Sequence, residues 1–155
     1  MARPVTAAQT LRPKRIASGG SATYSQSNQV EGAVTLQDSA TLTLGSRTDT
    51  ISSLTLSDST VQTSSGSGLL TVAGAITHSN GTGSISGNLR VSGADRVWTV
   101  TGGGDVLNVS AVVSEISSGS IVRAGAGRLN FTAENSIGNV RLDAGVTRFD
   151  NGSVF

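Results

Sequence analysis

Residues 33–56 read AVTLQDSATLTLGSRTDTISSLTL, and three segments of this stretch place one polar residue between two apolar ones. The segments are Val34-Thr35-Leu36, Leu42-Thr43-Leu44 and Leu54-Thr55-Leu56. Successive side chains of a β-strand point to opposite faces, so each segment directs its apolar pair to one face and its threonine to the other. Gly, Ser and Asp, which favour turns, lie between the segments. The stretch therefore predicts short, half-buried strands joined by turns.

The same apolar–polar–apolar triplet recurs through the rest of the chain. It appears as Leu70-Thr71-Val72, Leu89-Arg90-Val91, Trp98-Thr99-Val100, Leu107-Asn108-Val109, Leu129-Asn130-Phe131 and Val140-Arg141-Leu142. The last apolar residues of six triplets, Leu44, Leu56, Val72, Val91, Val109 and Phe131, follow one another at a loose period of about 17 residues. Repeats near this length stack into solenoids, in which each coil completes the core of its neighbour. We therefore expect an all-β fold, a parallel β-helix or solenoid.

An antiparallel β-sandwich or jelly roll is the alternative fold. It predicts tight two-residue turns between strands, and Asn-Gly is the typical sequence for such turns. Asn80-Gly81 and Asn151-Gly152 occur, but only the first lies between predicted strands. The chain has five aromatic residues among 155, which suits a narrow interior of aliphatic rows better than a broad sandwich core.

Charge divides the chain into two segments. Residues 1–29 contain both prolines and four cations, Arg3, Arg12, Lys14 and Arg15, without an acidic residue. Residues 30–155 contain seven arginines and ten acidic residues, so this part is net acidic. We predict an extended basic N-terminal arm over 1–29 and a β-solenoid body over 30–155.

Residues 119–152 resemble the autotransporter-associated β-strand repeat. The segment Gly125-Ala126-Gly127-Arg128-Leu129 matches the Gly-x-Gly-x-Leu run that begins this repeat, and Asn135 and Asn139 match its polar middle. Asp143-Ala144-Gly145-Val146 matches the turn into the next strand. The resemblance implies a right-handed parallel β-helix without catalytic residues, of the kind found in secreted bacterial passenger domains.

Residues suited to catalysis, metal binding or cofactor binding do not form a recognisable pattern. The chain has no cysteine and a single histidine, His78, which we expect to lie in a solvated loop. The acidic residues are scattered, and the run Gly102-Gly103-Gly104-Asp105 is interpreted as a turn that needs positive φ angles. We expect no enzymatic activity and no cofactor.

These features favour a structural protein of a large assembly. We expect a decoration or cement protein of a virion, a bacteriophage capsid, that forms a homotrimer and docks on capsid protein through Arg3, Arg12, Lys14 and Arg15. Trp98 is predicted either to fill the core or to anchor an interface. Four cations without interleaved aromatic residues are a poor footprint for nucleic acid, and no apolar run approaches a membrane-spanning length.

Two other functions remain open at this point. The first is a surface adhesin or passenger-type fragment, secreted or on the bacterial cell surface, that binds a receptor or glycan. The second is a tailspike-like fragment that binds or cleaves polysaccharide. Residues 1–20 lack the apolar run of a secretory signal peptide, which favours the virion hypothesis over a secreted protein.

Overall fold

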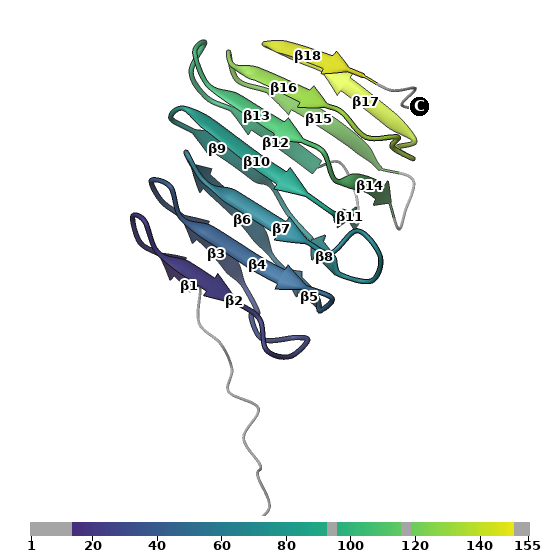
Figure 1. Ribbon diagram of the computed structural model, residues 1–155. Helices are drawn as coiled ribbons and strands as arrows, with labels where there is room; N and C mark the ends of the chain where they lie inside the picture. The colour runs from purple at the N-terminus through teal and green to yellow at the C-terminus, as the bar shows by residue number, and fades with distance from the viewer. Residues whose placement is uncertain (1–13, 93–95, 116–118, 151–155) are drawn as a thin grey trace, which may run out of the picture.

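The computed structural model describes residues 14–92, 96–115 and 119–150, which form a parallel β-solenoid of about six turns without a helix (Figure 1). Three sheets run along the solenoid. Sheet A consists of β1 (Lys14–Ile16), β3 (Ala33–Leu36), β6 (Ser53–Ser57), β9 (Ile76–Ser79), β12 (Arg96–Val100), β15 (Ser120–Ala124) and β17 (Asn139–Leu142). Sheet B consists of β2 (Ser21–Thr23), β4 (Thr41–Gly45), β7 (Thr60–Thr63), β10 (Thr82–Ser86), β13 (Val106–Val109), β16 (Arg128–Phe131) and β18 (Val146–Phe149). Sheet C consists of β5 (Thr48–Ile51), β8 (Leu69–Val72), β11 (Asn88–Val91) and β14 (Val112–Glu115).

Each complete coil contributes one strand to sheet A, then one to sheet B, then one to sheet C. Neighbouring strands within a sheet are parallel, as in the pairing of β3 with β6 and of β6 with β9. This arrangement confirms the predicted parallel solenoid over the antiparallel alternative. Asn80-Gly81 does form a turn, with φ angles of 60° and 69°, but it joins β9 of sheet A to β10 of sheet B instead of closing a hairpin.

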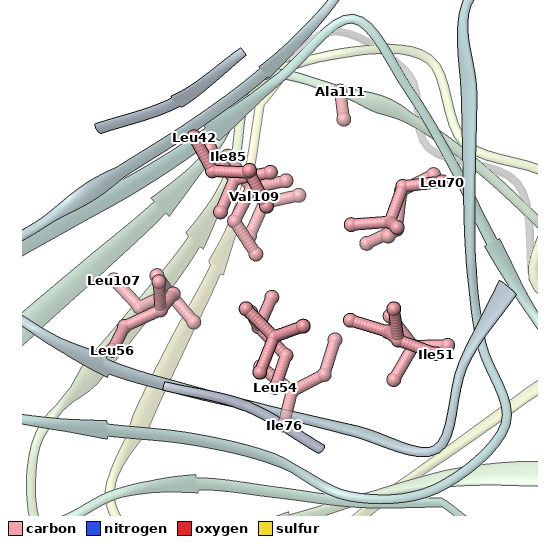
Figure 2. Close-up of a cluster of buried hydrophobic side chains, with 14 of the residues drawn as sticks. Leu42, Ile51, Leu54, Leu56, Leu70, Ile76, Ile85, Leu107, Val109 and Ala111 are labelled. Atoms are coloured by element: carbon pink, nitrogen blue, oxygen red, sulfur yellow. The ribbon is translucent and has the colours of Figure 1, made fainter. Parts of the chain in front are cut away.

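The core lies between the three sheets and consists of stacked aliphatic rows. Figure 2 shows Leu54 of sheet A, Leu42 of sheet B and Ile51 of sheet C, with their side chains in one common interior. All three are fully buried. The burial of Leu54 and Leu42 follows from the triplets, because the apolar pair of each strand faces inward and the polar residue faces solvent. Ile51 follows the same alternation on β5, where Thr48 and Thr50 face solvent. Each buried Leu or Ile contributes about 1.5–3 kcal/mol to folding.

The coils are longer than the sequence period predicts. The paired positions Val34, Leu54, Ile76, Trp98, Arg123 and Leu142 of sheet A follow one another after 20, 22, 22, 25 and 19 residues. The predicted period of about 17 residues is wrong because the indexed triplets belong to different sheets. Leu44 lies in sheet B, for example, whereas Leu56 lies in sheet A.

The solenoid also begins earlier than predicted. Strands β1 and β2 pair with β3 and β4, so residues from Lys14 onward belong to the first coil and not to an extended arm. Tyr24 and Val30, which follow β2 in this coil, are also buried. The boundary at residue 30 is therefore corrected to residue 14, while residues 1–13 lie outside the described part of the chain. Sequence patterning missed this coil because Ser21-Ala22-Thr23 offers only an alanine to the interior.

Candidate functional site

A shallow hollow of about 280 Å³ lies on the outer face of sheet C. We call it the sheet C hollow. Its lining residues come from the turn that leads into β8 and from β8, β11 and β14: Gly66, Ser67, Gly68, Leu69, Asn88, Arg90, Val112 and Ser114. The alternation of β11 turns Leu89 and Val91 into the core, so Asn88 and Arg90 face outward.

Asn88 fixes the wall of the sheet C hollow. Its Nδ2 donates hydrogen bonds to the carbonyl oxygens of Ser64, Ser65 and Gly68 at 3.0, 3.2 and 2.8 Å. Its backbone N–H donates to Thr63 Oγ1 at 2.6 Å. Gly68 has no room for a side chain, because a Cβ atom there would collide with the backbone of Gly45 and Ser64. The hydrogen bonds from Asn88 and the close packing at Gly68 therefore hold the turn over 64–68 against sheet C.

Arg90 supplies the charge of the hollow. It lies level with Thr71 on β8 and with Ser114 on β14, near the middle of the outer face of sheet C. Arg90 is half-buried, and among the described lining residues it is the one charged side chain. Within the described residues it has no hydrogen-bond or ion-pair partner. An arginine side chain without a partner is suited to a carboxylate, which the planar fork of its guanidinium binds through two hydrogen bonds.

The hollow also has apolar surface beside this charge. Val112 of β14 is 48 % exposed, and Leu69 of β8 is half-buried. Both residues occupy strand positions that face away from the core, where the other two strands of sheet C have Thr48 and Asn88. The hollow thus combines one cation, two hydroxyl groups and two apolar side chains. Sequence reasoning missed it, and the available signal was Arg90 itself, a cation at the polar position of its triplet.

The predicted basic residues are only partly described. Arg3 and Arg12 lie outside the described residues, whereas Lys14 and Arg15 lie on β1. Lys14 Nζ lies 5.9 Å from the centre of the Tyr24 ring. Arg15 Nε donates to Gln37 Oε1 at 2.7 Å. The structure therefore places these two cations at the N-terminal end of the solenoid, each with a contact inside the chain.

Trp98 belongs to the core. Its side chain has no exposed surface, and its ring centre lies 5.6 Å from that of Phe131. Phe131 in turn stacks on Phe149 at 5.4 Å, so three rings pack in sequence inside the C-terminal half of the solenoid. Of the two predicted roles, the structure supports core filling. Trp98 is therefore removed from the candidate partner-binding residues.

His78 is not a loop residue, which corrects the sequence prediction. It lies on β9 with no exposed surface, in the row that runs from Leu56 through His78 to Val100. Its Nε2 is 3.1 Å from the carbonyl oxygen of Gly81. The strand position explains the burial, because His78 takes an inward place that leucine or valine takes in the neighbouring coils. A solvent-borne substrate cannot reach this imidazole without opening the coil.

Two described carboxyl groups have shifted pKa values, and both shifts are downward. The backbone N–H of Gly102 donates to Asp105 Oδ2 at 2.7 Å, and this hydrogen bond lowers the pKa of Asp105. Arg141 Nε lies 2.9 Å from Asp143 Oδ1, and this hydrogen bond lowers the pKa of Asp143. A general acid needs a raised pKa, so neither group suits that role.

None of Gly102, Gly103 and Gly104 has a positive φ angle, so the prediction that this glycine run needs positive φ angles is wrong.

Arg123 is a cation buried in the core. It takes the inward position next to Trp98 and Leu142 and has no exposed surface. Its guanidinium donates to the carbonyl oxygens of Gly125 and Gly127 at 3.3 and 2.5 Å. Burial lowers the pKa of Arg123. Gly125, which has a φ angle of 84°, accommodates this turn because a Cβ atom there would collide with the carbonyl oxygen of Val100.

The described residues offer neither a metal-binding cluster nor a membrane-spanning helix. Among the described residues, no group of three or more His, Cys, Asp and Glu side chains is placed to hold a metal ion. The described part of the chain also has no helix of the length and hydropathy needed to cross a membrane.

Neither a protein-family model, nor a curated protein, nor a solved structure matches this chain.

Proposed function

We propose that this protein is a non-enzymatic structural component of a large assembly, and specifically a decoration protein of a bacteriophage capsid. The observation that carries the proposal is the continuous pairing of sheets A and B, each of which runs through seven strands. Every coil is hydrogen-bonded to the next along two faces, which makes a stiff body. Such a body serves a mechanical function without needing a catalytic group.

The docking segment of this proposal is the basic N-terminal region. Lys14 and Arg15 lie at one end of the solenoid, next in sequence to Arg12 and near Arg3. Several cations in one segment attract an acidic shell of capsid protein, and the attraction weakens as salt screens it. A homotrimer would present three such segments together and strengthen docking through multivalency.

Gene order and shell binding test the proposal together. We expect the coding sequence to lie among capsid and portal genes. The full chain should then co-sediment with shells assembled from the neighbouring major capsid gene, and the binding should decrease with salt. The double variant Lys14→Ala/Arg15→Ala should bind more weakly.

The matched control is the double variant Arg128→Ala/Arg148→Ala, which removes two exposed cations from β16 and β18, far along the chain from β1. It should bind shells as the unmodified protein does. Sedimentation of the protein alone should show a trimer. A monomer that does not bind shells would overturn the proposal, as would an in-frame outer-membrane barrel downstream of the coding sequence.

A further inference from the structure

We propose that the sheet C hollow is a binding site for acidic polysaccharide, with Arg90 as the residue that binds the sugar carboxylate. This site lies on a different part of the solenoid from Lys14 and Arg15, and the inference does not depend on the capsid proposal. It rests on three observations: the hollow itself, the half-buried cation without a partner, and the exposed apolar surface beside it.

The shape of the hollow fits one or two sugar rings. Its floor crosses β8, β11 and β14, and neighbouring strands lie about 4.8 Å apart, so it extends for roughly 10 Å along the solenoid axis. The turn over 64–68 bounds it on one side, held by Asn88. Because the wall and the floor are both fixed by hydrogen bonds, the site is formed before a ligand arrives, which reduces the entropy lost on binding.

The chemistry of the lining fits an acidic sugar. The guanidinium of Arg90 matches a uronic-acid carboxylate, and the hydroxyl groups of Ser67 and Ser114 are available for ring hydroxyls. Val112 and Leu69 offer apolar surface to the C–H groups of a sugar ring. Arg90 is the only charged residue among the described residues that line the hollow, so one carboxylate on each bound segment would complete its pairing. A neutral sugar would leave the guanidinium without a partner.

An acidic peptide fits this site less well. Peptides that bind to sheets gain affinity by adding a strand to a free edge. β8 and β11 have no free edge, because β8 pairs with β5 and β11, and β11 pairs with β8 and β14. The outer edge of β14 is met by the segment at Ser136, whose backbone N–H donates to the carbonyl oxygen of Val113 at 3.0 Å. A peptide backbone would therefore lie over sheet C without main-chain hydrogen bonds, whereas a sugar chain needs none.

The test uses the full chain and oligogalacturonate as the probe. Isotope-labelled protein is titrated with oligogalacturonate at low salt, and amide chemical shifts are followed. We expect saturable changes that concentrate at residues 66–69, 88–90 and 112–114. The methyl ester of the same oligosaccharide should bind at least about tenfold more weakly, because it keeps the rings and loses the charge.

Two variants distinguish specific binding at the sheet C hollow from non-specific electrostatic attraction. Arg90→Gln should weaken oligogalacturonate binding at least about tenfold, while Arg128→Gln, which removes the same charge from an exposed position on β16, should leave it unchanged. Equal losses in the two variants would overturn the proposal. So would equal binding of the methyl ester, or shift changes that polyglutamate produces and oligogalacturonate does not. If Arg90→Gln fails to fold, the shift map of the unmodified protein still decides.

Discussion

Leu54 and Leu142 provide a sharp test of the stacked core, because both occupy the same inward row of sheet A. Leu54 lies between Val34 and Ile76 and is fully buried, whereas Leu142 lies on the last described strand of sheet A and is 59 % exposed. Leu54→Ala should cost about 2–5 kcal/mol of unfolding free energy, from lost burial and the cavity that remains. Leu142→Ala removes a side chain that is less than half buried, so its cost should be about 1 kcal/mol or less.

Urea denaturation followed by far-UV circular dichroism measures both costs. The fluorescence of Trp98, the only tryptophan in the chain, gives a second probe two coils away from Leu54. Coincident transitions by the two probes would justify a two-state analysis. Thr55→Ala is the control for position, because Thr55 neighbours Leu54 and faces solvent. Equal costs for Leu54→Ala and Leu142→Ala would refute the assigned difference in burial along this row. Equal costs for Leu54→Ala and Thr55→Ala would refute the assigned inward and outward faces.

Two further predictions concern Tyr24 and Asn88. Burial raises the pKa of Tyr24, and the charge of Asp49 adds a smaller effect in the same direction. The folded state therefore favours the neutral phenol. The free energy of unfolding should fall as pH rises above about 10, the ordinary tyrosine pKa. Absorbance titration of this single tyrosine should show that the phenol ionises only when the protein unfolds. The variant Tyr24→Phe should lose less stability at high pH than the unmodified protein. Ionisation near pH 10 without unfolding would contradict the burial of Tyr24. Asn88→Ala should cost about 1–3 kcal/mol and expose the turn over 64–68 to protease, because three carbonyl oxygens lose their donor. Asn130→Ala, which removes a single side-chain bond to Asn108, should cost less, and equal protease sensitivity of the two variants would contradict this role of Asn88.

The faces of the strands could be predicted from the sequence, and so could their parallel stacking. The triplet Leu54-Thr55-Leu56 shows why: two inward leucines and an outward threonine satisfy a half-buried strand, and the partner triplets continue the same rows. Segments outside the triplets could not be predicted as well. His78 appears loop-like because Thr77 to Gly83 is polar, yet stacking gives it an inward place between Leu56 and Val100.

The sheet C hollow lies beyond what periodicity predicts. It depends on how the turn over 64–68 folds back onto β11, and that turn is fixed by Asn88, which is about 20 residues away in sequence. Local patterning carries no information on such a contact. The position of Arg90 within Leu89-Arg90-Val91 indicated an exposed cation, but only the neighbouring coils show that it lies in a hollow without a partner.

The unequal spacing of the coils has a consequence for how such a chain diverges in evolution. Consecutive positions in the sheet A row lie 19 to 25 residues apart, yet the inward rows stay aligned. The extra residues are therefore absorbed where the chain passes from one sheet to the next, outside the hydrogen-bonded ladders. Insertions and deletions at these corners leave the interior unchanged, so related chains can acquire new surface loops one coil at a time while they keep the same scaffold.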